Sequence, residues 1–328
     1  MVKIKDIARV CGVSAGTVDR ALNNRPGINK RTKQKILEVA KQLNYRPDYT
    51  ARSLVMGKTM TLGIVLFDLY NRSFAQLMNA IESKAREQGY FVYITLTDKN
   101  PENEKKCIEY LVSRKVDGII LFTVNKGNEF NSYLQKFNTP IITIFNYISS
   151  DWEYIGIQER EAMKDAVDYI VKKNYKKFIY VSPPLAFERV SNIYTQEERL
   201  EGFLQGLREN NIENQPLVVR DKKYIDALEG ITFNQTEKTA IVCSCDLYAL
   251  EVMNYLKGRG LSIPTDVGVM GFDDIDMLKY ITPRLTTVQY PIVDIGEKAV
   301  KSMIHKIEKD AYLSTPLLDY KIVRGESI

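Results

Sequence analysis

Four polar side chains stand where apolar runs of the chain end, and together they could bind a small polar ligand. They are Asp68, Asn146, Asp246 and Asp273. In open α/β sheets, ligands bind beyond the carboxyl ends of the strands. Asp and Asn also form turns, so a turn explains any one of them, whereas the set favours a shared cleft.

A second group of residues suggests contact with a surface outside the chain. In the stretch CGVSAGTVDRALNN, Ser14 can cap a helix whose first turn holds Ala15, Gly16 and Thr17. These residues are too small to anchor a core and too apolar for ordinary surface. Glycine in a helix costs roughly 0.5–1 kcal/mol relative to alanine, which suggests close approach, although a merely tolerated glycine is the alternative.

Three short helical patterns position this stretch. Residues 4–11 repeat apolar side chains at helical spacing, the second helix follows Ser14, and Asn29 can cap a third helix after the loop NNRPGIN. Helix, tight turn and capped helix within about 20 residues is the helix-turn-helix plan. Residues 1–58 hold thirteen Lys and Arg against four Asp and Glu, which suggests a polyanionic partner for the head, although charge alone fits a merely solvated basic surface equally well.

From Thr61 onward, short apolar runs alternate with amphipathic stretches. The runs are TLGIVLFD, YFVYITLTD, VDGIILF, PIITIFN, EYIGI, KFIYVS, PLVVRD, TAIVCSCD, DVGVMGFDD and LTTVQY. Such runs separated by helices predict parallel sheets covered on both faces. Their number exceeds that of one ordinary sheet, so we expect an α/β body with two doubly wound lobes behind a small all-α head.

Several classes of protein are disfavoured. No apolar run reaches 18 residues, and the N-terminus is charged throughout, so we expect neither a membrane span nor a signal peptide and place the protein in the cytoplasm. We expect no metal site at Cys243 and Cys245, no cofactor and no catalytic residue. The single histidine, His305, lies in an amphipathic helix, and no nucleotide-binding or hydrolase motif is present.

Three blocks resemble the LacI/GalR family of transcriptional regulators along essentially the whole chain. IKDIARVCGVSAGTVDRALNN resembles its helix-turn-helix, and YRPDYTARSLVMGKT resembles its hinge helix and linker. The block from Ala240 to Pro291, which includes Pro264 and Asp266, resembles its periplasmic-binding-protein-like effector core and is the most specific.

The resemblance implies a homodimeric repressor that binds double-stranded palindromic operator DNA, and whose affinity for the operator is controlled by a sugar-like effector. It also implies a head at 1–47, a hinge and linker at 48–60, and a body at 61–328. The first lobe would take about 61–160 and 291–318, and the second about 161–290 and 319–328.

The DNA-contacting positions carried over from the family lie in the head and the hinge. They are Ser14, Ala15, Gly16, Thr17, Arg20, Asn23, Asn29, Lys30, Arg31, Ala51 and Leu54. Arg20 can bind guanine bidentately, or else clamp a phosphate. Leu54 would wedge into the minor groove, or else pack a linker helix. Asp19 departs from the family's usual Ser, and would pair with Arg20 or accept from cytosine.

The ligand-contacting positions carried over lie around the expected cleft. They are Asp68, Asn71, Phe74, Asn146, Arg199, Asp246, Asp273 and Tyr290. For Phe74 and Tyr290 the alternative is core packing. For Arg199 it is a salt bridge with Glu197, Glu198 or Glu201. Cys245 departs from a common Asn, which suggests an effector other than the best-known ones. A sugar-binding module or a sugar-metabolising enzyme without a DNA role remains the rival interpretation.

Overall fold

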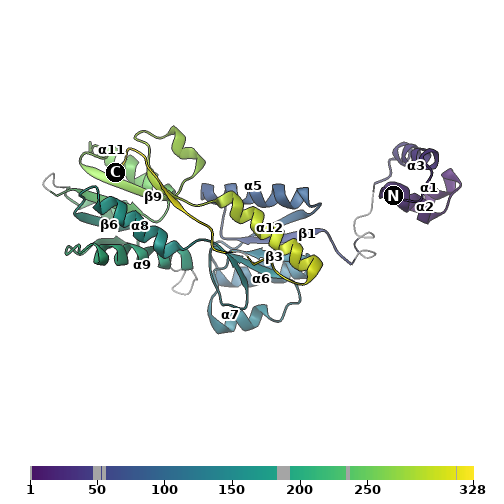
Figure 1. Ribbon diagram of the computed structural model, residues 1–328, viewed down its shortest axis with the longest axis horizontal. Helices are drawn as coiled ribbons and strands as arrows, with labels where there is room; N and C mark the ends of the chain where they lie inside the picture. The colour runs from purple at the N-terminus through teal and green to yellow at the C-terminus, as the bar shows by residue number, and fades with distance from the viewer. Residues whose placement is uncertain (1, 47–52, 54–56, 183–192, 234–236, 315) are drawn as a thin grey trace. The chain divides into compact units, whose positions relative to one another are not determined.

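The computed structural model describes residues 2–46, 53, 57–182, 193–233, 237–314 and 316–328 (Figure 1). The chain forms two compact units, Met1–Thr59 and Met60–Ile328. They are called the head and the body below, and each is described by itself.

In residues 2–46, the described N-terminal part of the head, three helices match those predicted. They are α1 (Ile4–Cys11), α2 (Ala15–Leu22) and α3 (Lys30–Gln42). The Ser14 hydroxyl accepts the Thr17 amide of α2, and the Asn29 side chain accepts the Arg31 amide of α3. The buried core consists of Ile7, Ala8, Cys11, Val18, Ala21, Ile36, Val39 and Ala40. Most of the hinge expected within residues 48–60, namely 48–52 and 54–56, lies outside the described residues.

The first sheet of the body has five parallel strands in the order β2-β1-β3-β4-β5. Their bounds are β1 (Thr61–Leu66), β2 (Phe91–Leu96), β3 (Gly118–Leu121), β4 (Ile141–Ile144) and β5 (Glu153–Ile155). The helices that follow these strands are α5 (Arg72–Glu87), α6 (Pro101–Ser113) and α7 (Gly127–Leu134). Strands β3 and β4 are buried along their whole length, as their unbroken apolar runs predicted.

The second sheet has six strands in the order β11-β10-β9-β8-β6-β7, and only β11 is antiparallel to its neighbour. Their bounds are β6 (Lys177–Val181), β7 (Leu217–Val219), β8 (Thr239–Cys243), β9 (Val267–Asp273), β10 (Thr286–Gln289) and β11 (Lys321–Val323). The associated helices are α8 (Glu159–Val171), α9 (Tyr194–Glu209), α10 (Asp226–Glu229), α11 (Asp246–Gly258) and a 3-10 helix, η1 (Asp276–Tyr280). Each of the ten predicted apolar runs contains a strand, so the predicted fold class is confirmed.

Helices cover both faces of both sheets. In the first sheet, α5 and α12 (Ile292–Lys309) pack on one face, and α6 and α7 pack on the other. In the second sheet, α8 and α9 take one face, and α10 and α11 take the other. Side chains of successive strand residues alternate between the two apolar layers, as strand geometry requires.

The chain passes between the two sheets three times (Figure 1). It leaves the first sheet after β5, returns from β10 to place α12 beside α5, and crosses again so that β11 joins the second sheet. The lobes are therefore linked by several segments rather than by one. The residue boundaries predicted for the lobes stay a prediction.

Helices α8 and α9 approach closely at Gly202. A Cβ atom at this position would lie 2.1 Å from the main-chain oxygen of Arg160. No side chain can move to relieve this contact, because the atom belongs to the backbone of α8. Gly202 therefore sets the distance between the two helices that cover one face of the second sheet.

We expect Gly202→Ala to lower the free energy of unfolding by at least about 1–3 kcal/mol, because the added methyl overpacks the interface between α8 and α9. Urea denaturation measures the change. The matched control is Gly258→Ala, since nothing lies within 4 Å of a Cβ there; it should be neutral or stabilising by up to about 1 kcal/mol. Equal effects of the two substitutions would contradict the close approach.

Candidate functional site

The leading end of α2 is a bare, exposed surface. Ala15 and Gly16 are exposed, and a Cβ at Gly16 would meet only the Ser14 hydroxyl, at 3.8 Å. The fold of the head therefore does not require glycine here. The free-energy cost of Gly16 to the helix is better explained if another molecule must approach the backbone of α2 closely at this point.

The basic groups of α2 and α3 are available at the surface of the head. Arg20, Lys30 and Arg31 are exposed, and no described residue forms an ion pair with Arg20. Asn23 is half-buried and donates to the Asp19 carboxylate at 2.8 Å. Ala51 and Leu54, the two predicted contacts of the hinge, lie outside the described residues.

Asp19 has a partner that the sequence did not indicate. Its carboxylate forms an ion pair with Arg25 at 3.2 Å, in the turn after α2, rather than with Arg20. The departure from serine thus ties the end of α2 to the following loop. It leaves the guanidinium of Arg20 uncompensated and free to contact another molecule.

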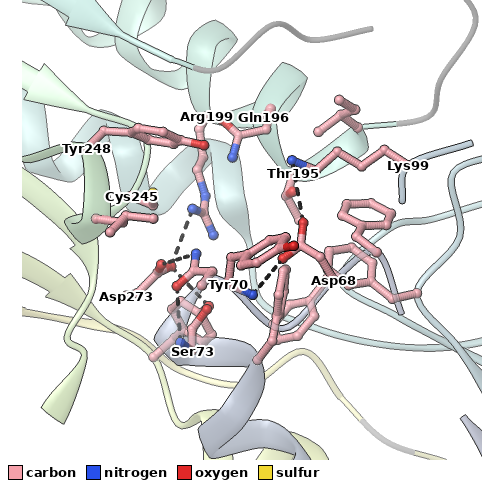
Figure 2. A pocket seen from close by; sticks show the side chains of 18 residues that line it. Asp68, Tyr70, Ser73, Lys99, Thr195, Gln196, Arg199, Cys245, Tyr248 and Asp273 are labelled. Carbon is pink, nitrogen blue, oxygen red and sulfur yellow. Dashed lines mark hydrogen bonds and ion pairs between the residues drawn. The ribbon is translucent and has the colours of Figure 1, made fainter. Parts of the chain in front are cut away.

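A cavity in the body is lined by residues from both sheets (Figure 2). Of the predicted ligand contacts, six line it: Asp68, Asn71, Phe74, Arg199, Asp273 and Tyr290. The cavity volume is about 180 Å³, below the roughly 300–1,000 Å³ of sites for drug-sized ligands. It therefore suits a molecule of monosaccharide size.

Arg199 on α9 is the centre of the cavity wall that the second sheet supplies. Its Nε donates to Glu159 at 2.7 Å, and its Nη1 donates to the main-chain oxygen of Ser244 at 2.6 Å and lies 3.5 Å from the Asp273 carboxylate. The guanidinium also stacks on the Phe272 ring, 3.7 Å from its centroid. No described residue accepts a hydrogen bond from Nη2, which is the donor left for a ligand.

Glu159, the main partner of Arg199, was not predicted. The sequence suggested glutamates next to Arg199, but Glu197 pairs with Lys126 and Glu198 pairs with Arg160. Glu159 is separated from Arg199 by 40 positions and starts α8. Only the packing of α8 against α9 brings the two side chains together, so no local pattern could have indicated the pair.

Asp273 closes the wall at the end of β9. Its carboxylate accepts from the Tyr290 hydroxyl at 3.0 Å and from Asn71 of the first sheet at 3.5 Å. Its backbone φ is +126°, in a region that side chains rarely adopt. Burial raises the pKa of Asp273 to about 6, although Arg199 opposes the rise. Its negative charge is therefore only partly compensated by Arg199.

The first sheet supplies an ion pair and an aromatic wall. Asp68 accepts the main-chain amide of Tyr70 at 3.0 Å and lies 3.7 Å from the ammonium group of Lys99, which points toward it in Figure 2. Phe74 packs edge-on against Phe122, with ring centroids 5.2 Å apart. Phe74 therefore belongs to both the aromatic cluster and the cavity wall, so the two interpretations offered for it are compatible.

Asn146 and Asp246, the other two predicted ligand contacts, are not among the residues that line the cavity, and their role in ligand binding stays a prediction. Asn146 is buried, donates to the Thr123 oxygen at 2.8 Å and accepts the Thr195 amide at 3.2 Å. Asp246 is buried, and its two oxygens bind the Ile275 amide and the Thr287 hydroxyl. Both polar groups hold neighbouring loops in place, because a buried polar group requires a partner.

Other residues line the cavity without having been predicted. They are Phe67, Tyr70, Ser73, Lys99, Phe122, Phe145, Ile193, Thr195, Gln196, Cys245, Leu247 and Tyr248. Cys245, which stands where the family often has Asn, was noted only as a departure. Burial raises the pKa of both Cys243 and Cys245, so the thiols keep their protons and are poor metal ligands. No cluster of possible metal ligands occurs in the described part of the chain.

Two ion pairs join the sheets outside the cavity. Arg72 at the start of α5 makes a bidentate pair with Asp276 of η1, with both contacts at 2.8 Å. Lys126 lies 3.4 Å from Glu197. These contacts, together with the Asn71–Asp273 hydrogen bond, connect the lobes on both sides of the cavity.

We expect Asp246→Asn to change how stability depends on pH. Burial, helped by Asp273, raises the pKa of Asp246 to about 8. The folded state thus keeps a proton that the unfolded state releases near pH 3.8, so this group lowers the free energy of unfolding as pH rises between these values. Asparagine can accept from the Ile275 amide through its oxygen and can donate from its nitrogen to the Thr287 hydroxyl, without the charge. The Tm of the variant minus that of the wild type should therefore increase between pH 4 and 8.

Thermal unfolding at constant ionic strength measures this difference. Asp319→Asn is the control, because Asp319 is exposed and its replacement should shift Tm equally at every pH. A difference for Asp246→Asn that does not change with pH would show that the buried carboxyl is not the titrating group.

A basic helix-turn-helix head and a two-lobed α/β body around a polar cavity define a class of protein: DNA-binding regulators that respond to a small molecule. Residues 3–48 match the family described as bacterial regulatory proteins, lacI family, and residues 167–328 match a periplasmic binding protein-like domain. No helix of the described chain is long and apolar enough to cross a membrane.

The chain is 33% identical to the HTH-type transcriptional regulator RegA of Clostridium acetobutylicum over 332 residues, which cover 99% of this chain and 98% of that protein. The chain belongs to the LacI family of bacterial transcriptional regulators. It is a DNA-binding regulator rather than an enzyme, in agreement with the main interpretation of the sequence.

Two solved structures extend the comparison. A Lac repressor dimer bound to operator and the anti-inducer ONPF has the same fold, with a TM-score of 0.86 and 21% identity, over 99% of this chain and 98% of that one. A periplasmic binding protein/LacI transcriptional regulator from Alkaliphilus metalliredigens, complexed with D-xylulofuranose, has a TM-score of 0.69 and 26% identity, over 82% of this chain and 98% of that one.

Proposed function

We propose that this chain acts in the cytoplasm as a homodimer that binds a palindromic operator, and that a sugar-like effector of monosaccharide size controls this binding. One observation carries the proposal: the cavity is closed by Asp273 from one sheet and Asn71 from the other. A ligand that contacts both walls changes the relative free energies of the lobe arrangements, which is the requirement for allosteric control.

The proposed DNA interface is the exposed end of α2 together with the start of α3. Ala15 and Gly16 allow the helix to enter the major groove by its N-terminal end, and Arg20 contacts a base edge. Asn29, Lys30 and Arg31 contact phosphates, which position the head without selecting sequence. Ser14, Thr17 and Asn23 complete the interface, and Ala51 and Leu54 of the hinge contact the minor groove.

An exposed apolar edge supports dimerisation. Strand β2 is at the edge of the first sheet, and Tyr93, Ile94 and Leu96 on it are 41–49% exposed. An edge strand with apolar side chains is prone to associate with another chain. A dimer has two heads, and two-fold symmetry then requires a palindromic site.

The experiment for Arg20 distinguishes base contact from phosphate contact. We expect Arg20→Ala to weaken binding to the preferred duplex, selected from a random pool, by about 1–3 kcal/mol and to relax preference at one base pair per half-site. Fluorescence anisotropy measures both effects. Arg9→Ala is the control, because Arg9 is exposed on α1 and should leave the preference unchanged. Equal weakening on all sequences would assign Arg20 to a phosphate.

The effector proposal is tested by measuring both binding reactions on one protein. A sugar that binds should stabilise the body by about 2.7 kcal/mol when its free concentration is 100 times its Kd. It should also change the affinity for the operator, typically by a factor that corresponds to about 1–3 kcal/mol. Deleting residues 1–59 should abolish DNA binding and leave sugar binding intact. Sugar binding without any effect on DNA affinity would leave only a binding module.

A further inference from the structure

We infer that the cavity selects against anionic effectors and takes an uncharged polyhydroxylated molecule, and that Asp68 imposes this selection by neutralising Lys99. The inference rests on the proposed effector function and adds the charge of the ligand and the residue that decides it. It comes from the balance of charged groups in and behind the cavity wall.

The charge of Arg199 is already matched by the protein. Its guanidinium lies 2.7 Å from the Glu159 carboxylate and 3.5 Å from that of Asp273, and the side chains of all three residues are at most 5% exposed. A ligand carboxylate or phosphate at Arg199 would therefore enter a site where two acids surround one base. No unpaired cation at Arg199 would offset the free-energy cost of desolvating that anionic group.

Lys99 is the only other cationic residue among the described residues of the cavity wall, and it is also matched. Its ammonium group lies 3.7 Å from the Asp68 carboxylate. The turn that delivers it holds Asp98 and Lys99 at φ of +52° and +60°, a conformation that is unfavourable for residues other than glycine, asparagine and aspartate. Lys99 therefore lies beside Asp68, at the edge of the cavity, in a backbone conformation that is unfavourable for lysine.

The buried carboxyl group of Asp246, behind the wall, shows that further negative charge is disfavoured there. The pKa of Asp246 is raised by burial and then by Asp273, and Asp274 adds to the rise. The same region raises the pKa of Asp273 itself, mainly through burial. Negative charge is therefore already disfavoured at this end of the cavity before any ligand arrives.

The groups that remain are suited to hydroxyls and to C–H surface. Nη2 of Arg199 can donate, and the carboxylates of Asp68 and Asp273 can accept from hydroxyl groups. The aromatic cluster around Phe74 and Phe122 offers ring faces and edges to the apolar side of a sugar ring. An uncharged polyol uses both sets of groups without adding charge.

The test compares ligands that share a skeleton and differ in charge. Glucose, galactose and ribose are each measured by calorimetry on the full chain, with glucuronate, galacturonate, glucose 6-phosphate, ribose 5-phosphate and glucosamine as the charged counterparts. For each sugar skeleton that binds, we expect the neutral sugar to bind at least 10-fold more tightly than its charged counterparts. Tighter binding of an acid, a phosphate or the amine would overturn the inference.

Asp68→Asn tests the assigned residue. Asparagine keeps an oxygen for the Tyr70 amide but removes the charge that neutralises Lys99. We expect the ratio of uronate affinity to neutral-sugar affinity to rise at least 10-fold in this variant. Asp98→Asn is the matched control, because Asp98 is exposed and does not line the cavity, and its ratio should match the wild type. An unchanged ratio in Asp68→Asn would overturn the role of Asp68.

Failure of the proposed function has a different signature. If no sugar in any charge form binds while the protein still binds its operator, the sugar-effector proposal fails. If an anionic sugar binds best and changes operator affinity, the proposed function stands and only the charge inference is wrong.

Discussion

A buried guanidinium, that of Arg199, constrains much of the body. An isolated charge in the interior is very costly, and it persists only with ionised partners and hydrogen bonds in good geometry. Here the partners come from three separate places: Glu159 at the start of α8, the main chain at Ser244 after β8, and Asp273 at the end of β9. These elements must be correctly placed relative to one another before the charge is satisfied.

The same requirement explains other features of the second lobe. The close approach of α8 and α9 at Gly202 brings Glu159 within reach of Arg199. Asp246 holds the backbone after β9 through the Ile275 amide, so the strained conformation at Asp273 is maintained by its surroundings. The cavity wall is thus preorganised by groups that do not touch the ligand.

Much of the fold followed from patterns in the sequence, because strands buried on both faces leave unbroken apolar runs and capped helices leave Ser or Asn at fixed places. The helix caps at Ser14 and Asn29 and the ten runs were visible in this way. The site was only partly predictable. The end of an apolar run correctly indicated Asp68 and Asp273 as residues of the cavity wall. Asp246 also ends an apolar run, but its side chain is buried and hydrogen-bonded within the protein.

The missed residues share a physical reason. Glu159 reaches Arg199 through the packing of α8 against α9, and Lys99 reaches the cavity through an unusual turn. Neither leaves a periodic or local signal in the sequence. Asp19 illustrates the same point in the head, where its partner Arg25 is in the next loop. For Arg199 and Asp19, the ion-pair partners expected from nearby positions in the sequence were wrong, because the folded chain brings a more distant residue into contact.

The two ion pairs between the lobes lie near the surface, with Arg72 and Asp276 46% and 39% exposed. At physiological ionic strength, charges in such positions are partly screened, and the screening increases with salt. Contacts between a basic head and DNA phosphates weaken under the same conditions, because each counterion released from the DNA gains less entropy when the bulk salt concentration is higher. Ionic strength therefore acts on the contacts between the lobes and on the contacts of the head with DNA at once.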